Sequence, residues 1–598
     1  MAKEKSNIGL NVLFGITFLS PVTYSILAYE MDVIQRMFFF SISLLLLLVF
    51  ILKYKNSKAI ALNRFLLLLM ILFPFSFLTS FVNDSAFLLP LKLTDIIIPL
   101  TILLQSAMLF VMLGEDKFFK VVSYSIVIIA TLFSIVGLFE VFQITILPLP
   151  SVMPPGSTLG HRGFAAEYLL SAIPFFLIAT EYLSENKKNL LLAAAIINVS
   201  FLLFTRSRAG IVILLLAVFA YFIFIFIKKE KSDRFKSAKP VLIVLVISFL
   251  ISLIPVKVGE RPDFKSTAAS FFDEDFKSNV LRLNFWDASF QMIKEKPLTG
   301  IGLYKWSGSY PKYHGEYFDD KNLFMVHNIH AHNDFLETFA ESGFFSFLVF
   351  LLIYFTIVLT LFNKTNKNKK YFPLLLTILI TFAFSFVSFP NYKFASHFLA
   401  AVVGGVAFVS LSDNLNNTIT IRLNVFKWIL FTALLICGTV SYIKLQSELN
   451  YGKALYLKDR KQAILMLQKL EEVSEIFYPF DASKQPVDHY RGIANTYLGR
   501  HSEALKNNLS ANELAPFNPL VWRNIAGSYQ ALGNSKSAIE QFEKIQNQFP
   551  NYINAQIILL ELYIESGQKE KAASLYKDLV KKTPSNPKLL KYKNQINE

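Results

Sequence analysis

Long apolar segments alternate with short polar segments over the first three quarters of this chain. Runs of about 16 to 24 mostly apolar residues can cross a hydrocarbon core of roughly 30 Å, because an α-helix rises 1.5 Å per residue. About thirteen such runs lie near 8–28, 37–53, 60–82, 94–113, 119–142, 164–180, 189–205, 209–227, 240–256, 343–362, 371–389, 394–411 and 426–445. The pattern predicts an all-α, polytopic integral membrane protein with 12 or 13 transmembrane helices. We expect the first run to remain in the membrane, because it is too long for a signal peptide and further runs follow directly.

Composition agrees with a bilayer location. Of 598 residues, 54% are hydrophobic and only 17% are charged, which does not describe a soluble protein. The single cysteine, Cys437, excludes an intramolecular disulfide framework and a four-thiolate metal site. The net charge of +16 would suggest a nucleic-acid partner, but the Lys and Arg residues form short clusters between apolar runs. We therefore expect no nucleic-acid partner.

Alternate polar loops carry these basic clusters, and basic loops face the cytoplasm. The clusters lie within 53–58, 117–120, 187–188, 228–239 and 364–370. The segment 143–163, the turn with Arg206 and Arg208, and the long loop 257–342 are then external. We expect a multi-pass membrane protein with a cytoplasmic amino terminus and an external part after residue 445.

The chain after residue 445 has a repeat of 34 residues. Gly499, Gly533 and Gly567 keep this spacing, and Ala504, Ala538, Ala572 and Pro516, Pro550, Pro584 keep it too. A 34-residue period with a Gly turn, a small Ala on the second helix and a closing Pro is typical of tetratricopeptide repeats. We predict two domains, a transmembrane domain over 1–445 and a repeat domain over 446–598, with a degenerate first unit over 446–480.

Polar residues concentrate in the external loops. The predicted spans contain few ionisable residues, whereas a transporter places them near the bilayer midplane. Five of the eight histidines lie in two external loops, at 161, 314, 327, 330 and 332. This distribution favours an enzyme that works at the outer face.

Several short motifs occur together on that face. They are TLGHRGFAAEYL from residue 158, FTRSRAG from 204, VLRLNFWDASF from 280 and HNIHAHNDFLETFAESG from 327. The chain resembles the O-antigen ligase and O-antigen polymerase superfamily, which includes bacterial O-oligosaccharyltransferases, over roughly residues 90–412. The most specific elements are His332-Asn333, Ser207-Arg208 and Arg282. The chain departs from the family pattern at Tyr304, Ser346 and His161-Arg162-Gly163.

The resemblance implies a lipid-linked glycosyltransferase that acts without a metal or another cofactor. Its donor would be a saccharide on undecaprenyl pyrophosphate, and the acceptor stays open among lipid A core, a polysaccharide chain end and Ser or Thr of a protein. Tetratricopeptide arrays form surfaces for peptides, so we also expect a protein partner on the repeats.

Each candidate residue has a chemical reason. A lipid pyrophosphate needs fixed cations at headgroup depth, and Arg binds phosphate oxygens bidentately. We assign that role to Arg208 and Arg282, and to Arg206 unless it only anchors a span end. We predict that His332 is the general base for the acceptor hydroxyl, kept neutral by a short helix over 333–342 that follows it. Further substrate contacts are assigned to Arg162, Asn333, His330 and Glu341.

Other interpretations of these residues are weaker. His327, His330 and His332 with Asp334 lack the spacing of a helical zinc site, so we expect loop contacts from His327 and His330. Gly300 and Gly302 predict a tight turn, because no strand-turn-helix unit surrounds them. Glu337 fits a solvated helix face as well as a site. The rival functions are a glycosidase, which needs two flanking carboxylates, a flippase or transporter, and an assembly scaffold.

Overall fold

The computed structural model describes residues 2–592 except 27, 29, 54–58, 151, 257–262, 271–276, 322–328, 411–417 and 460–461. Within these residues, ten helices are long and apolar enough to cross a membrane, and two apolar helices, 11–22 and 394–409, are shorter. The chain is therefore a mostly helical, multi-pass membrane protein, as its hydropathy predicts. Each of the thirteen expected runs contains helix, but only ten reach full span length.

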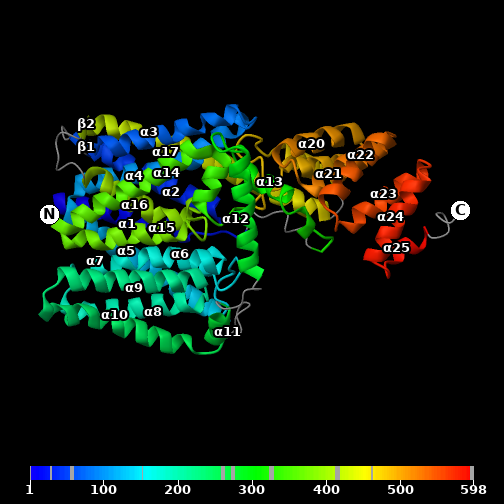
Figure 1. Cartoon of the computed structure of the whole chain (residues 1–598). Coiled ribbons are helices and arrows are strands. Elements are labelled where there is room, and N and C mark those ends of the chain that lie inside the picture. Colours follow the sequence, from blue (N-terminus) through cyan, green and yellow to red (C-terminus); the bar gives the residue numbers. More distant parts are fainter. Residues whose placement is uncertain are drawn as a thin grey trace.

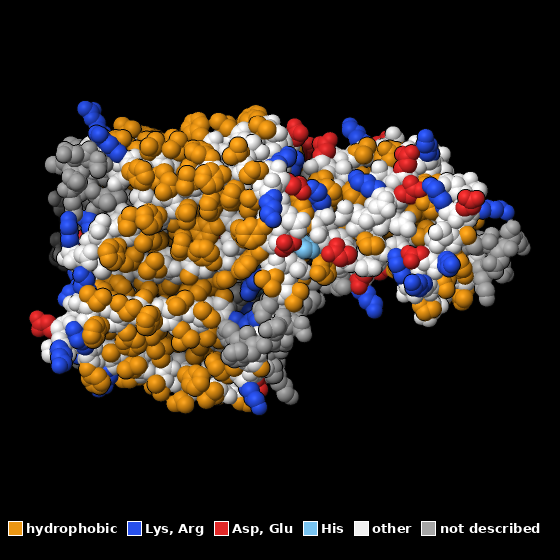
Figure 2. Space-filling model, in the orientation of Figure 1, with side chains coloured by type: hydrophobic (Ala, Val, Ile, Leu, Met, Phe, Trp, Pro, Cys, Tyr) orange, Lys and Arg blue, Asp and Glu red, His pale blue; other side chains and the backbone are white. Residues whose placement is uncertain are grey.

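The helices of the membrane part follow one another closely. They are α1 (Ala2–Thr17), α2 (Met31–Lys53), α3 (Arg64–Ser76), α4 (Leu89–Leu113), α5 (Glu115–Val141), α6 (Arg162–Ala172), α7 (Pro174–Ala179), α8 (Glu185–Phe204), α9 (Arg208–Lys228), α10 (Lys231–Ser252), α14 (Asp334–Lys367), α15 (Phe372–Phe384), α16 (Phe394–Ser410) and α17 (Leu423–Asp459). One large apolar cluster joins most of them. Figure 2 shows hydrophobic side chains over the face of this bundle that is in view and charged side chains toward its ends.

Two strands were not expected from the sequence. β1 (Ala59–Asn63) pairs antiparallel with β2 (Thr418–Arg422), and Ala59 lies opposite Arg422. This ribbon lies at the end of the bundle that also holds the amino terminus (Figure 1). It joins the loops before α3 and α17, which are far apart in sequence.

The long loop between α10 and α14 contains α11 (Phe264–Ala269), α12 (Lys277–Glu295) and α13 (Lys305–Ser309). Figure 1 shows α12 running across the ends of the membrane helices, at the end opposite to the amino terminus. The helix that follows, α14, breaks at Gly343, where φ is 81°. The break separates a short helix over 334–342 from the membrane span, so the short helix predicted there is confirmed.

The tail is an array of helix pairs. It contains α18 (Ala463–Glu471), α19 (Val487–Tyr497), α20 (His501–Leu514), α21 (Pro519–Ala531), α22 (Ser535–Gln548), α23 (Ile553–Glu565), α24 (Lys569–Lys582) and α25 (Pro587–Leu590). The three periodic glycines, Gly499, Gly533 and Gly567, all have positive φ and join the two helices of a pair. The periodic alanines are buried. The repeat architecture predicted from the 34-residue period is confirmed.

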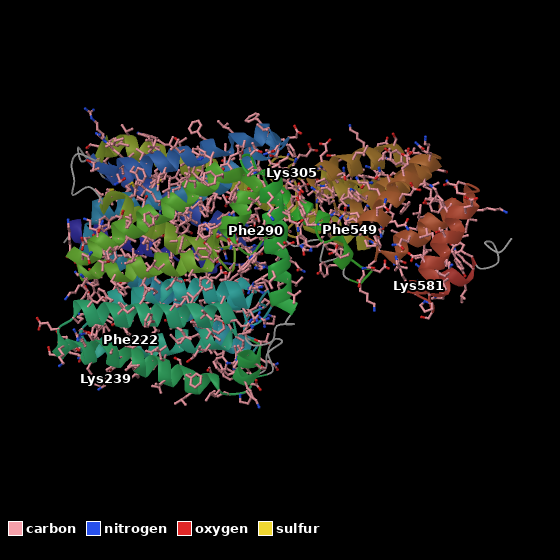
Figure 3. The ribbon with its side chains drawn as sticks, in the orientation of Figure 1. Phe222, Lys239, Phe290, Lys305, Phe549 and Lys581 are labelled. Atoms are coloured by element: carbon pink, nitrogen blue, oxygen red, sulfur yellow. The ribbon has the colours of Figure 1, made fainter. Side chains whose placement is uncertain are left out.

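Helix α17 crosses residue 445 without a break and carries the chain from the membrane into the tail. The division into domains at residue 445 therefore stays a prediction. The tail lies at the same end of the bundle as α12 and α13 (Figure 1). In Figure 3, Lys305 and Phe549 lie near the junction with the tail, whereas Phe222 and Lys239 lie in the membrane part. The loop 257–342 and the repeats thus share one side of the bundle.

Candidate active site

The predicted site residues come from four segments that meet at the tail side of the bundle. His161 and Arg162 begin α6, Arg208 begins α9, Arg282 lies on α12 and His332 precedes α14. Three of them interact electrostatically. After the larger effect of burial, the positive charge of Arg282 lowers the pKa of His332, and that of Arg208 lowers the pKa of Arg282. The structure therefore brings together residues that are 170 positions apart in sequence.

His332 occupies an aromatic pocket. Its ring lies 5.8 Å from the Phe285 ring and 5.0 Å from the Phe389 ring, measured between centroids. Its Nδ1 is buried and has no hydrogen-bond partner within the described part of the chain. Burial, followed by the charges of Arg282, His330 and His161 in that order of effect, lowers the pKa of His332 to about 3. The ring is therefore neutral at physiological pH and can accept a proton.

The backbone at His332 is also unusual. Its φ of 52° lies in the left-handed region, which costs a non-glycine residue of order 1 to 3 kcal/mol. Asn333 follows as the N-cap of α14, and its Oδ1 accepts from the backbone N–H groups of Phe335 and Leu336 at 3.1 and 3.0 Å. Asn333 Nδ2 donates to the Phe386 carbonyl oxygen at 3.2 Å. Both polar atoms of this amide thus hold the turn, and a substrate contact from Asn333 stays a prediction.

Arg208 and Arg206 differ in environment although they share one turn. Ser207 caps α9 by accepting from Gly210 N–H at 3.2 Å, and Arg208 Nη1 donates to the Ser270 carbonyl oxygen at 2.8 Å. Arg206 is only 2% exposed, donates from Nη2 to the Ser252 carbonyl oxygen at 2.8 Å and lies over the Phe264 ring. The geometry of Arg206 is that of an anchor between helix ends. Arg208 is partly exposed, as a substrate contact requires.

Helix packing explains the glycine of the Ser207-Arg208-Ala209-Gly210 motif. A Cβ at Gly210 would lie 2.9 Å from the Ala166 Cβ, so α9 packs against α6 where both helices begin. His161 caps α6, because its Nδ1 accepts from Gly163 N–H at 3.0 Å. Burial, followed by Arg162 and Lys393, lowers the pKa of His161 to about 4. Arg162 is placed at the first turn of α6, beside this ring.

His330 is a buried partner of Glu337. The His330 Nδ1 lies 2.7 Å from Glu337 Oε1, and Glu337 Oε2 accepts from Ala331 N–H at 2.8 Å. The two side chains are 4% and 2% exposed. The solvated helix face considered for Glu337 is therefore wrong, because the short helix 334–342 lies inside the protein. His330 packs between the rings of Phe389 and Tyr392 at 4.4 and 4.3 Å.

Glu341 supports the external loop. Its Oε1 accepts from Trp306 N–H at 3.3 Å, and its backbone carbonyl accepts from Gly302 N–H at 3.0 Å. Gly300 and Gly302 form a tight turn with φ of 70° and 120°, and a Cβ at Gly300 would lie 2.3 Å from the Glu341 carbonyl. The substrate contact assigned to Glu341 stays a prediction.

Glu167 is a site residue that sequence reasoning did not assign. It is 3% exposed on α6 and accepts hydrogen bonds from Ser388 Oγ and, at 2.6 Å, from Ser396 Oγ. The positively charged side chains of Lys393 and Arg282 both interact electrostatically with this carboxyl group. A lone carboxylate inside an apolar segment is by default a functional candidate, which was the available signal.

The membrane helices contain more ionisable residues than the hydropathy runs predicted. Arg36 Nη1 lies 3.0 Å from Asp95 Oδ1, and Lys444 Nζ lies 3.2 Å from the same oxygen. Arg36 was missed because α2 begins earlier than the expected run, whereas Asp95 and Lys444 lie at the ends of the runs 94–113 and 426–445. Tyr304 of the external loop donates to Asp95 Oδ2 at 2.5 Å, so this network lies at the loop side of the bundle. A polar cavity of about 70 Å³ beside it also receives Lys484 from the tail.

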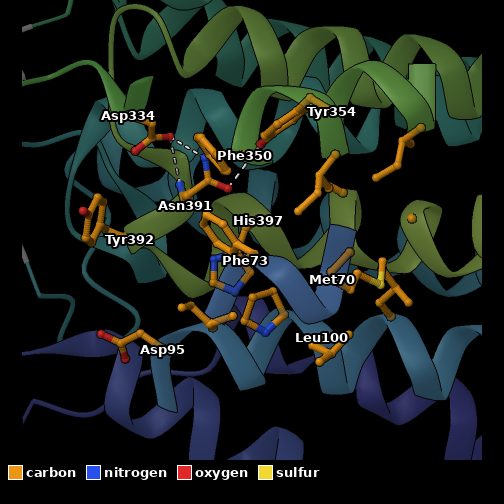
Figure 4. A pocket seen from close by; sticks show the side chains of 18 of the residues that line it. Met70, Phe73, Asp95, Leu100, Asp334, Phe350, Tyr354, Asn391, Tyr392 and His397 are labelled. Atoms are coloured by element: carbon orange, nitrogen blue, oxygen red, sulfur yellow. Dashed lines mark hydrogen bonds between the residues drawn. The ribbon is translucent and has the colours of Figure 1, made fainter. Parts of the chain in front are cut away.

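A larger cavity of about 210 Å³ lies among α3, α4, α14 and α16. Figure 4 shows Asp334 hydrogen-bonded to Asn391, and Asn391 to Tyr354, at its polar end, with Met70 and Leu100 at the apolar end. Within the described residues no group of three or more His, Cys, Asp or Glu side chains could hold a metal ion. His327 lies outside those residues.

Comparisons with known proteins agree with this picture. A family model described as O-Antigen ligase matches residues 193–351, and a model described as Tetratricopeptide repeat matches residues 522–552. No curated protein matches the chain. A solved structure described as "Functional Characterization of Pseudomonas Aeruginosa pilF" is 14% identical and covers 40% of this chain and 96% of its own, with a TM-score of 0.23. Another, "Crystal structure of APC/C hetero-tetramer Cut9-Hcn1", is 11% identical and covers 88% and 96%, with a TM-score of 0.23.

Proposed function

We propose that this protein, which carries an O-antigen ligase domain and a C-terminal tetratricopeptide repeat, transfers a saccharide from undecaprenyl pyrophosphate to an acceptor hydroxyl. The single observation that carries the proposal is a neutral His332 beside the cation Arg282. Both residues, and Arg208, lie within the matched range 193–351. A base and fixed cations are what this transfer needs.

The donor pyrophosphate binds between Arg208 and Arg282. Without a ligand these guanidinium groups oppose each other, since Arg208 lowers the pKa of Arg282, after the larger effect of burial. An anion between them relieves that repulsion, and planar guanidinium groups bind phosphate oxygens in pairs. Arg162 at the start of α6 adds a third cation. Glu167 offsets part of the charge on Arg282 when no donor is bound.

His332 then acts as the general base. The acceptor oxygen forms a bond to the anomeric carbon while the bond from that carbon to the phosphate oxygen breaks. The acceptor proton goes to the His332 ring, and the electron pair of the broken bond stays on undecaprenyl pyrophosphate, where the arginines hold the added charge. Donor phosphates near Arg282 also weaken its effect on His332 and raise the pKa of that ring. The His332 ring is therefore a stronger base when the donor is bound. The transfer needs no metal, because the arginines supply the positive charge.

We propose that the reaction takes place at the outer face of a bacterial inner membrane, with the amino terminus in the cytoplasm. The basic loops 53–58 and 228–239 support this orientation. The acceptor is lipid A core, a polysaccharide chain end, or Ser or Thr of a protein, and a protein partner binds the external repeats.

The rival functions have specific difficulties. A flippase or transporter needs ionisable residues at the midplane, whereas the buried pair of Arg36 and Asp95 also contacts Tyr304 of the external loop. A scaffold has no use for a half-buried neutral histidine close to two arginines.

A reconstituted reaction tests the proposal. The purified full-length protein in lipid nanodiscs receives a synthetic undecaprenyl-pyrophosphate disaccharide and, in separate reactions, each of the three acceptor classes. Mass spectrometry should find one glycosylated acceptor and released undecaprenyl pyrophosphate. Movement of the donor across proteoliposomes without transfer to any acceptor would favour the transporter instead.

A further inference from the structure

The repeat array packs against the external loop of its own chain. Trp306, Tyr310 and Phe318 of the loop share one buried apolar cluster with Trp522 and Phe549 of the array. All five side chains are at most 2% exposed. The Phe318 and Phe549 rings lie 5.9 Å apart. Figure 3 shows Phe549 where the array meets this loop.

Amide side chains of the array also bind the loop backbone. Gln548 Nε2 donates to the carbonyl oxygens of Pro311 and Lys312 at 3.1 and 2.9 Å. Asn551 Nδ2 donates to the Glu316 carbonyl oxygen at 2.6 Å. A Cβ at Gly315 would lie 1.9 Å from the Gln548 carbonyl oxygen, so only glycine permits this approach. The array therefore holds segment 305–320 as it would hold a peptide ligand.

A short chain of contacts leads from that segment to His332. Trp306 Nε1 donates to Ser289 Oγ on α12 at 2.9 Å, and the Trp306 ring meets the Phe285 ring edge-on at 5.8 Å. Phe285, also on α12, stacks on His332. Trp306 N–H donates to Glu341, at the end of the short helix that follows His332. Displacement of the loop would therefore move the Phe285 wall of the histidine pocket and disturb the short helix that follows His332.

We propose that the repeat array is an internal clamp, whose ligand is segment 305–320 of the same chain and whose function is to position α12 and His332 for transfer. This inference rests on the proposed function. It makes Gln548 and Asn551 positioning residues, although both lie far along the chain from the motifs of the ligase domain. Part of the array surface is occupied by the chain itself, and the remainder is left for a partner.

The first test removes the backbone contacts without touching the site. The double variant Gln548→Ala and Asn551→Ala should lower kcat by about tenfold to a hundredfold, the range expected when a catalytic group is displaced by about 1 Å. The donor KM should rise by a smaller factor than kcat falls, because Arg208, one of the two donor-binding arginines, lies on α9 and not on α12. Gln530→Ala, an exposed amide on α21 of the same array, is the matched control and should leave both values unchanged. Unchanged kcat in the double variant would overturn the proposal.

A cross-link distinguishes a fixed clamp from a loop that leaves the array in each cycle. A Cβ at Gly308 would lie 3.4 Å from the Ala515 Cβ, close to the separation in a disulfide, and 2.9 Å from the Ala515 Cα, so the two segments must separate slightly to accept the cysteine. In a Cys437→Ala background, Gly308→Cys and Ala515→Cys should form a disulfide in the full-length protein, scored by maleimide-polyethylene-glycol tagging after denaturation. Transfer should be the same in the oxidised and the reduced protein.

Each outcome has one meaning. Absence of the cross-link would show that the loop does not lie on the array, and loss of transfer only on oxidation would show that the loop must leave it; both overturn the clamp. If the wild-type protein transfers no saccharide, the proposed function fails first. If it does and the double variant equals it, only the clamp fails.

Discussion

The Phe285 ring lies nearly parallel to the His332 imidazole, with 5.8 Å between centroids and 11° between planes. The Phe389 ring also lies beside it, with 5.0 Å between centroids and 74° between planes. These rings keep water from the imidazole, and that burial is the largest cause of its low pKa. Phe285 on α12 and Phe389 in the segment between α15 and α16 thus help to keep His332, on a third segment, in its neutral form.

The first prediction concerns pH. A histidine with a lowered pKa stays neutral to lower pH, so the free enzyme keeps its base well below the ordinary value of about 6.5. We expect kcat/KM to fall less than about threefold between pH 8 and pH 5, whereas a base with the ordinary pKa would lose about thirtyfold. The acid limb of kcat should lie at higher pH than that of kcat/KM, since the bound donor opposes the effect of Arg282. Steady-state rates across this range check both statements, and an acid limb of kcat/KM centred near 6.5 would contradict them.

The second prediction separates the two arginines of one turn. Arg208→Lys should raise the donor KM nearly as much as Arg208→Ala, by about tenfold to a hundredfold, because an ammonium cannot replace the paired hydrogen bonds of a guanidinium. Arg206→Lys is the comparison. It should lower the thermal midpoint through loss of the Ser252 contact and leave the donor KM nearly unchanged. The assignment fails if Arg208→Lys binds donor like the wild type.

Topology gives the third prediction. Ser535 and Ser232 are both exposed, on the array and on α10, and Cys437 is buried. A membrane-impermeant maleimide should label Ser535→Cys in spheroplasts whose cytoplasmic membrane is intact. It should label Ser232→Cys only after that membrane is permeabilised. The reverse pattern would place the site and the repeats in the cytoplasm and would contradict the proposed orientation.

Much of the fold was predictable because it depends on local patterns. Apolar runs indicate membrane helices, and the 34-residue period of Gly533 and its equivalents indicates the repeats. The segment of Arg208 and that of His332 were recognisable from short motifs. The ribbon of β1 and β2 was not predictable, because its strands are separated by 354 residues and each is only five residues long.

The neighbours of the site could not be predicted for the same reason. Glu167 is bonded to Ser388 and Ser396, and Gln548 is bonded to the loop near Pro311, but nothing in the local sequence links these positions. The role of Asn333 as a helix cap was hidden because a cap and a substrate contact use the same polar atoms. Long-range packing decides such contacts, and it is visible only in three dimensions.

The most direct test of the account replaces His332 by alanine. Purified wild-type and His332→Ala proteins in nanodiscs are compared for turnover at saturating donor and for equilibrium binding of a fluorescent undecaprenyl-pyrophosphate saccharide. Loss of a general base costs about a hundredfold to ten-thousandfold in rate, so kcat should fall at least about a hundredfold while the donor Kd, which depends on Arg208 and Arg282, changes less than about threefold. A His332→Ala protein that keeps more than about a tenth of wild-type turnover would contradict the account, because the base would then have to be another group.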